Sequence, residues 1–161
     1  MNCAYSAENV RGTLTKIEKS IEIAASPEKI YSKDIWERIP EWHSGFKTVE
    51  WTSKEKNKVG STLHVTGEVA GIKAEADIEI TEWKDNEMVA WRTLSGSIQG
   101  SGSASMIPTK VGTKYTVVIE YQLPYSIFGK MIDKVTVRKR IEKISDDALK
   151  KLKEKVEKEN F

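Results

Sequence analysis

Cysteine and long apolar runs are almost absent from this chain of 161 residues. Cys3 is the single cysteine, so no intramolecular disulfide can form. No continuous apolar stretch is long enough to cross a bilayer, and the first residues lack the apolar core of a signal peptide. These absences predict a soluble, cytoplasmic protein without stable membrane insertion.

An excess of charge of either sign is also missing. Lys and Arg number 26 against 24 Asp and Glu, which gives a formal net charge of +2. Proteins that bind nucleic acid usually concentrate positive charge. We therefore expect no nucleic-acid partner, and the sequence carries no signal for a particular oligomeric state.

Residues suited to metal, nucleotide or nucleophilic chemistry are sparse. His43, His64 and Cys3 are too widely separated in the sequence for zinc-ligand spacing. No glycine-rich segment leads into a helix with a lysine, as a phosphate-binding loop would require. The Gly-Ser-Gly within residues 95–103 lacks the strand-turn-helix setting of an activated serine, and its glycines are predicted to let a strand bend. We expect no cofactor, no metal and no catalytic residue.

The N-terminal half begins with one strand and two short helices. Apolar and polar residues alternate over residues 13–24, which is typical of a half-buried strand. Ser26-Pro27-Glu28 predicts a helix start, with Ser26 capping the first-turn amides. Residues 35–42 indicate a second short helix that ends in a turn at Pro40.

Six more alternating stretches, separated by turn residues, predict an antiparallel meander, and a long amphipathic helix follows Pro124. A kink or break of that helix is expected near Ser145. The order predicts an α+β fold in one domain, residues 1–161, with residues 1–12 as a loose tail. A curved sheet wrapped around one helix would leave a cavity between them. The six predicted strands are 46–53, 62–70, 73–83, 87–94, 97–107 and 113–123.

Several short motifs, in this order and spacing, resemble the START-like (SRPBCC) superfamily of polyketide cyclase/dehydrase and lipid-transport proteins over roughly residues 15–158. That resemblance implies a helix-grip fold: a seven-stranded antiparallel sheet around a C-terminal helix, with two small helices closing one end of a cavity. Members include lipid and sterol carriers, ubiquinone-binding proteins, hormone receptors and aromatase/cyclases, so the resemblance does not select one activity. The motifs are Ser26–Tyr31, Pro40-Glu41-Trp42, Val59-Gly60-Ser61, Glu82-Trp83, Trp91-Arg92, Gly112-Thr113, Leu123-Pro124, Gly129 and Leu149-x-x-Leu152-Lys153.

Most charged strand residues are predicted to face solvent. His64 and Glu68 alternate with apolar neighbours, which places them opposite the core. The acidic stripe over residues 75–79 is interpreted as a solvated face, and Arg92 is expected to pair with an acidic neighbour there. His43 follows Trp42 in a loop near the cavity mouth; the prediction is an exposed loop histidine, with a ligand contact as the alternative.

The predicted inner face is apolar and aromatic, so its residues either fill a core or line a ligand pocket with a few polar anchors. Tyr115, Tyr121 and Gln99 are the groups that could orient a ligand. The candidate ligand-binding residues are Trp42, Val65, Ile78, Trp91, Met106, Tyr115, Ile119, Tyr121, Phe128, Met131, Ile132 and Val135.

Three functions fit these patterns. The first is binding or carrying a hydrophobic small molecule, such as a lipid, an isoprenoid quinone or a polyketide-like aromatic. The second is a cofactor-independent cyclase or dehydratase that uses cavity tyrosines and a strand acid or base. The third is an accessory module that touches a membrane or partner transiently through residues 125–128, which could equally cap the core.

Overall fold

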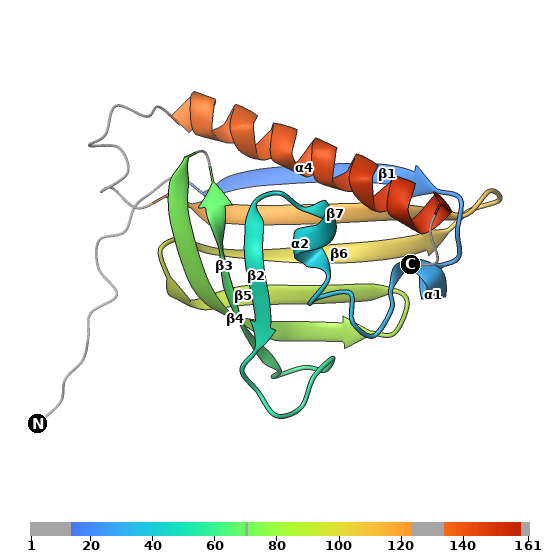
Figure 1. Ribbon diagram of the computed structural model, residues 1–161, viewed down its shortest axis with the longest axis horizontal. Coiled ribbons are helices and arrows are strands. Elements are labelled where there is room, and N and C mark those ends of the chain that lie inside the picture. The colour runs from blue at the N-terminus through green and yellow to red at the C-terminus, as the bar shows by residue number, and fades with distance from the viewer. Residues whose placement is uncertain (1–13, 70, 124–133, 159–161) are drawn as a thin grey trace, which may run out of the picture.

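The computed structural model describes residues 14–69, 71–123 and 134–158 (Figure 1). Within these ranges, seven strands form one antiparallel sheet in the order β1-β7-β6-β5-β4-β3-β2. The first strand therefore pairs with the last, and the other neighbours follow as successive hairpins. The strands are β1 (Thr15–Ile23), β2 (Phe46–Trp51), β3 (Thr62–Val69), β4 (Ile72–Lys84), β5 (Met88–Gly96), β6 (Gln99–Pro108) and β7 (Thr113–Gln122).

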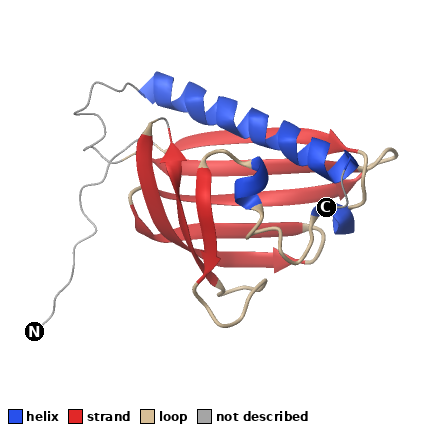
Figure 2. Ribbon diagram, in the orientation of Figure 1, coloured by secondary structure: helices blue, strands red, loops and turns tan. Residues whose placement is uncertain are grey.

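Helices α1 (Pro27–Ile30), α2 (Ile39–Trp42) and α4 (Lys134–Lys158) complete the described architecture. The long α4 extends beside β1, and α2 contacts both β2 and α4 (Figures 1 and 2). This arrangement confirms the predicted helix-grip fold, with its two short helices between strands β1 and β2. The main apolar core lies between the sheet and the C-terminal half of α4.

The buried faces follow from strand and helix periodicity. In β3, Leu63 and Val65 are buried while His64 between them is not, so the period-2 alternation sets which face turns inward. In α4, the fully buried Leu152 and Val156 are four residues apart on one stripe. Burying both faces together removes a large apolar area from water, which is the main stabilising contribution.

Three local predictions are wrong. Pro40 lies in the first turn of α2, where its missing N–H costs nothing, and therefore does not end that helix. Helix α1 does begin after Ser26, but the Ser26 side chain makes no capping hydrogen bond. Helix α4 continues through Ser145 without a break: Ser145 itself is buried, and buried residues of the same helix lie before and after it.

A glycine in β6 makes room for an indole ring from the neighbouring strand. Gly102 is paired with Trp91 of β5, and a Cβ at Gly102 would lie 2.4 Å from Cζ2 of that tryptophan. The close approach explains why this strand tolerates a glycine that weakens strands elsewhere. Gly102 therefore allows Trp91 to lie flat over the sheet.

Some predictions fall on residues outside the described ranges: the loose tail over residues 1–12, the helix entrance at 125–128, and the start of the long helix before residue 134. Among the described helices, none has both the length and the apolar character needed to cross a membrane.

Candidate functional site

Two adjoining pockets lie between the sheet and α4. The first, of about 210 Å³, is near the β3–β4 hairpin, and we call it the hairpin lobe. The second, of about 170 Å³, lies among Trp36, Trp42 and Trp91, and we call it the tryptophan lobe. Both are apolar concave sites of the kind that hold small hydrophobic molecules.

The two lobes meet at a waist. Five residues line both pockets, so the two lobes adjoin each other at these side chains. The waist residues come from four elements and one loop: the loop after α2, then β2, β3, β7 and α4. They are His43, Phe46, Val65, Ile119 and Ser145.

Aromatic rings build the tryptophan lobe. Trp36 packs edge-on against Trp51 and Trp91, with ring centroids 6.2 Å and 5.6 Å apart. Its Nε1–H donates a hydrogen bond of 3.1 Å to the hydroxyl oxygen of Tyr31. These contacts hold one wall of the lobe rigid, because edge-to-face pairs and a buried hydrogen bond both favour a single geometry.

Two tyrosines place hydroxyl groups in this apolar surrounding. Burial raises the pKa of Tyr115 to about 12. Burial also raises the pKa of Tyr31 well above its ordinary value, an effect that the hydrogen bond from Trp36 only partly offsets. Both phenols are therefore uncharged at neutral pH and can exchange hydrogen bonds with a ligand.

His43 is the polar side chain at the waist whose chemistry is best defined. Its Nδ1 accepts a hydrogen bond of 3.2 Å from the backbone N–H of Gly45. The ring packs edge-on against Trp42 and Phe46, with centroids 5.9 Å and 4.8 Å away. Burial lowers the pKa of His43 to about 4, so at neutral pH the ring is uncharged and its proton is on Nε2.

The strand acids and His64 lie on the outer face, as predicted. His64 Nδ1 is 2.8 Å from an Asp77 carboxylate oxygen, and both side chains are partly exposed to solvent. Arg92 pairs with Glu79 at 2.8 Å, which confirms the expected acidic partner. Glu68 is also exposed, so these groups do not line the cavity; Glu75 differs from the rest of the predicted acidic stripe, because it is exposed at the rim of the hairpin lobe.

The structure brings most of the predicted site residues to the cavity. Six of them line the tryptophan lobe, and Tyr121 lines the hairpin lobe. Met106 is buried in the core beside the lobes without lining either one among the described residues. Their contact with a ligand stays a prediction. The six are Trp42, Val65, Ile78, Trp91, Tyr115 and Ile119.

Two predicted positions are wrong, and three cannot be placed. Val135 is 61% exposed, because it lies on the opposite side of α4 from the buried Val137. Gln99 is exposed at the end of β6 and lines neither lobe among the described residues. The remaining predicted residues, Phe128, Met131 and Ile132, lie outside the described part of the chain.

The polar waist is the part of the site that the sequence pattern does not predict. The pattern indicates an exposed loop for His43, but the rings of Trp42 and Phe46 pack against the imidazole. The pattern at Ser145 indicates a helix break, although this residue faces the cavity from an unbroken helix. The available signal is the helical spacing of Ser145 from Ala148 and Leu149, which places all three on one face.

Comparison with known proteins gives one family. The family model described as polyketide cyclase / dehydrase and lipid transport matches residues 15–157. An uncharacterised 17.2 kDa protein of Streptomyces lincolnensis is 28% identical over 129 residues, which cover 79% of this chain and 81% of that protein.

Solved structures share the fold. A protein from Thermus thermophilus is 23% identical with a TM-score of 0.73, covering 88% of this chain and 97% of that one. A START superfamily protein from Mycobacterium smegmatis is 19% identical with a TM-score of 0.71 and the same coverage, 88% and 97%. The Zhui aromatase/cyclase from Streptomyces sp. R1128 is 12% identical with a TM-score of 0.71, covering 90% and 94%. At these identities the likeness concerns the fold alone.

Proposed function

The chain belongs to the polyketide cyclase / dehydrase and lipid transport family, and we propose that it binds or carries a hydrophobic small molecule between the sheet and α4. The ligand classes that fit are a lipid, an isoprenoid quinone or a polyketide-like aromatic. One observation carries the proposal: two adjoining lobes lie between the sheet and α4, and their walls are almost entirely apolar. Apolar surface left open in a core is costly unless a ligand covers it.

The charge distribution supports a binding role. Among the described residues that line the cavity, one carries a carboxylate: Glu75, which is exposed at the rim of the hairpin lobe. The lining contains no Lys or Arg among the described residues. A cavity of this kind favours uncharged molecules, because a charged ligand would lose its hydration without gaining a partner.

A titration with the apolar fluorophore N-phenylnaphthylamine tests the proposal. Ile119 lines both lobes, so Ile119→Trp should fill the waist and weaken probe binding at least about tenfold, the factor for about 1.4 kcal/mol. Val118→Trp is the matched control, because Val118 is the next residue of β7 and faces the other side of the sheet. Saturable binding to the wild type and to Val118→Trp is expected.

Two results would overturn the proposal. The first is an absence of saturable probe binding to the wild-type protein. The second is equal affinity for the wild type and Ile119→Trp, which would place the probe on the surface. Circular dichroism of both tryptophan variants provides the check that the fold is retained.

The second candidate function is the cyclase or dehydratase. It is favoured by a single observation: one pocket wall holds the uncharged imidazole of His43 together with the phenols of Tyr31 and Tyr115. It is opposed by the outward direction of His64 and by the exposure of Glu68. Incubation with a linear poly-β-ketone, followed by measurement of the aromatic absorbance, distinguishes the two functions. A carrier leaves the absorbance unchanged. A cyclase raises the absorbance, and this rise requires the His43 side chain.

A further inference from the structure

The waist of the cavity carries a polar group that a purely apolar ligand would leave unused. His43 lines both lobes at the point where they meet, and so does Ser145 from the facing helix. The rest of the waist consists of Phe46, Val65 and Ile119. Two polar side chains, those of His43 and Ser145, therefore lie at the waist between the two lobes.

The orientation of the imidazole ring is fixed by its neighbours. The Gly45 N–H donates to Nδ1 at 3.2 Å, so Nδ1 is occupied as an acceptor. The rings of Trp42 and Phe46 pack edge-on against the imidazole. A Cβ at Gly45 would lie 3.1 Å from Cε1 of His43, so the absence of a side chain there lets the ring lie close to the backbone. With Nδ1 accepting, Nε2 carries the hydrogen and is a donor.

From this geometry we propose that His43 Nε2–H is the recognition group for an uncharged oxygen acceptor, such as a carbonyl, located near the middle of an elongated apolar ligand. The inference rests on the proposed binding function and narrows its ligand class. Apolar portions on either side of the oxygen occupy the hairpin lobe and the tryptophan lobe. A carboxylate is disfavoured, because the described lining offers no Lys or Arg to pair with it.

A matched set of three small molecules tests the position and the chemistry of this acceptor. Benzophenone has a carbonyl between two rings, diphenylmethane has the same rings without the oxygen, and diphenylacetate replaces the ketone with an anion. Their affinities are measured by displacement of N-phenylnaphthylamine from the full chain. The informative quantity is the ratio of benzophenone affinity to diphenylmethane affinity in each variant, because general damage to the cavity affects both molecules.

Two substitutions separate hydrogen bonding from packing. His43→Phe keeps a ring beside Trp42 and Phe46 but removes the donor, and should lower the ratio about five- to tenfold, as expected for one buried hydrogen bond. His43→Gln retains an N–H near the position of Nε2 and should preserve most of the ratio. The carbonyl stretching band of bound benzophenone should shift to lower wavenumber in the wild type and His43→Gln, and lose that shift in His43→Phe.

The failures of the two proposals are distinguishable. If the fluorophore itself does not bind the protein, the proposed binding function fails. If both bind and the ratio is unchanged in His43→Phe, the binding function stands and the role of His43 is overturned. Tighter binding of diphenylacetate than of benzophenone would also overturn the inference, since it would indicate a cationic anchor.

Discussion

At the scale of single residues, apolar side chains of the strands and the imidazole of His43 meet at the waist of the cavity. Alternation in β3 and β7 was sufficient to assign Val65 and Ile119 to the inner face. His43 has no such signal, because it follows a short proline-containing helix in a loop without periodicity. It lines the same pocket as Ile144 and Ser145 of α4, which are far along the chain, so only the folded arrangement reveals its place.

The two histidines of the chain should titrate in opposite directions from the ordinary value. Burial lowers the pKa of His43 to about 4, whereas the hydrogen bond to Asp77 raises the pKa of the outward-facing His64. Proton NMR of the imidazole signals against pH checks this, and His64→Gln assigns the signals because the chain contains 2 histidines. Two titrations near the ordinary value of 6.5 would contradict the burial of His43.

The same shift predicts a pH dependence of stability. Between pH 6.5 and about 4 the unfolded state binds a proton at His43 that the folded state does not, so stability falls as the pH falls through this window. The loss is of order 1–3 kcal/mol, allowing for partial exposure of the ring. Urea unfolding at both ends of the window should show that the wild type loses more stability than His43→Phe as the pH falls. His64 acts in the opposite sense, since its contribution is present at low pH and is lost as the pH rises through its raised pKa.

At the scale of elements, strand periodicity and turn residues predicted all seven strands of the sheet, with ends within a few residues of those observed. The helix ends were harder to predict. Pro40 is compatible with either the beginning of a helix or the turn after one, and the choice depends on the packing of α2 against β2 and α4. Ser145 followed by Asp146 and Asp147 has the composition of a helix start, but Ser145 is buried within a continuous α4.

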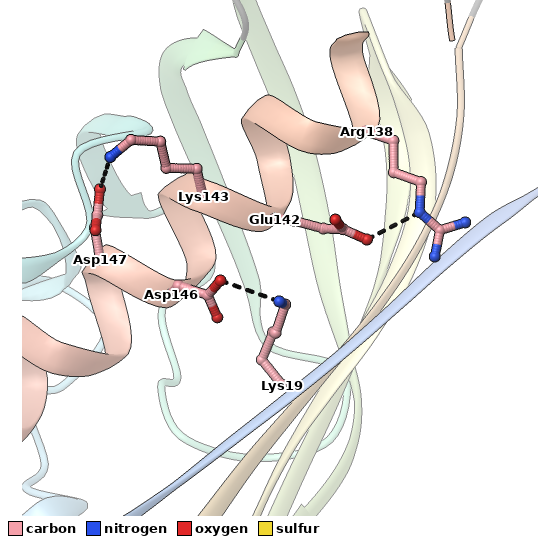
Figure 3. Close-up of polar contacts among 6 residues, drawn as sticks. All are labelled: Lys19, Arg138, Glu142, Lys143, Asp146 and Asp147. Atoms are coloured by element: carbon pink, nitrogen blue, oxygen red, sulfur yellow. Dashed lines mark hydrogen bonds and ion pairs between the residues drawn. The ribbon is translucent and has the colours of Figure 1, made fainter. Parts of the chain in front are cut away.

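Ion pairs lie along the solvent side of α4, both within the helix and between the helix and β1. Lys19 of β1 and Asp146 are 3.0 Å apart, while Arg138–Glu142 and Lys143–Asp147 are pairs within the helix (Figure 3). All of these side chains are at least partly exposed, so each pair contributes about 1 kcal/mol or less. The attachment of α4 to the sheet must therefore come chiefly from its buried apolar stripe.

Because buried apolar packing should stabilise α4 more than its exposed ion pairs do, two substitutions in α4 should lower the free energy of unfolding by unequal amounts. Leu152→Ala should lower the free energy of unfolding by about 2–5 kcal/mol, because Leu152 is fully buried and its removal leaves a cavity. Asp146→Asn breaks the pair with Lys19 and should cost less than about 1 kcal/mol. Urea denaturation of both variants in low and high salt is the measurement. A cost for Asp146→Asn equal to that for Leu152→Ala would mean that ionic contacts hold the helix.

At the scale of the whole molecule, the fold class followed from the order of elements, but the shape of the cavity did not. A filled core and an open pocket use the same residue types, and the difference depends on volumes between elements distant in sequence. Trp91 illustrates this, because its ring lies over Gly102 of the next strand and leaves the tryptophan lobe open. The extent of the single domain and the cytoplasmic location stay predictions.

The most direct test of cavity binding is an NMR measurement of nuclear Overhauser effects between protein methyl groups and bound N-phenylnaphthylamine. We predict cross-peaks to the methyl groups of the cavity residues Val65, Ile78 and Ile119. Cross-peaks confined to Leu94, Ile107 and Val111, which are exposed apolar residues on the surface, would contradict a ligand-binding cavity between the sheet and α4.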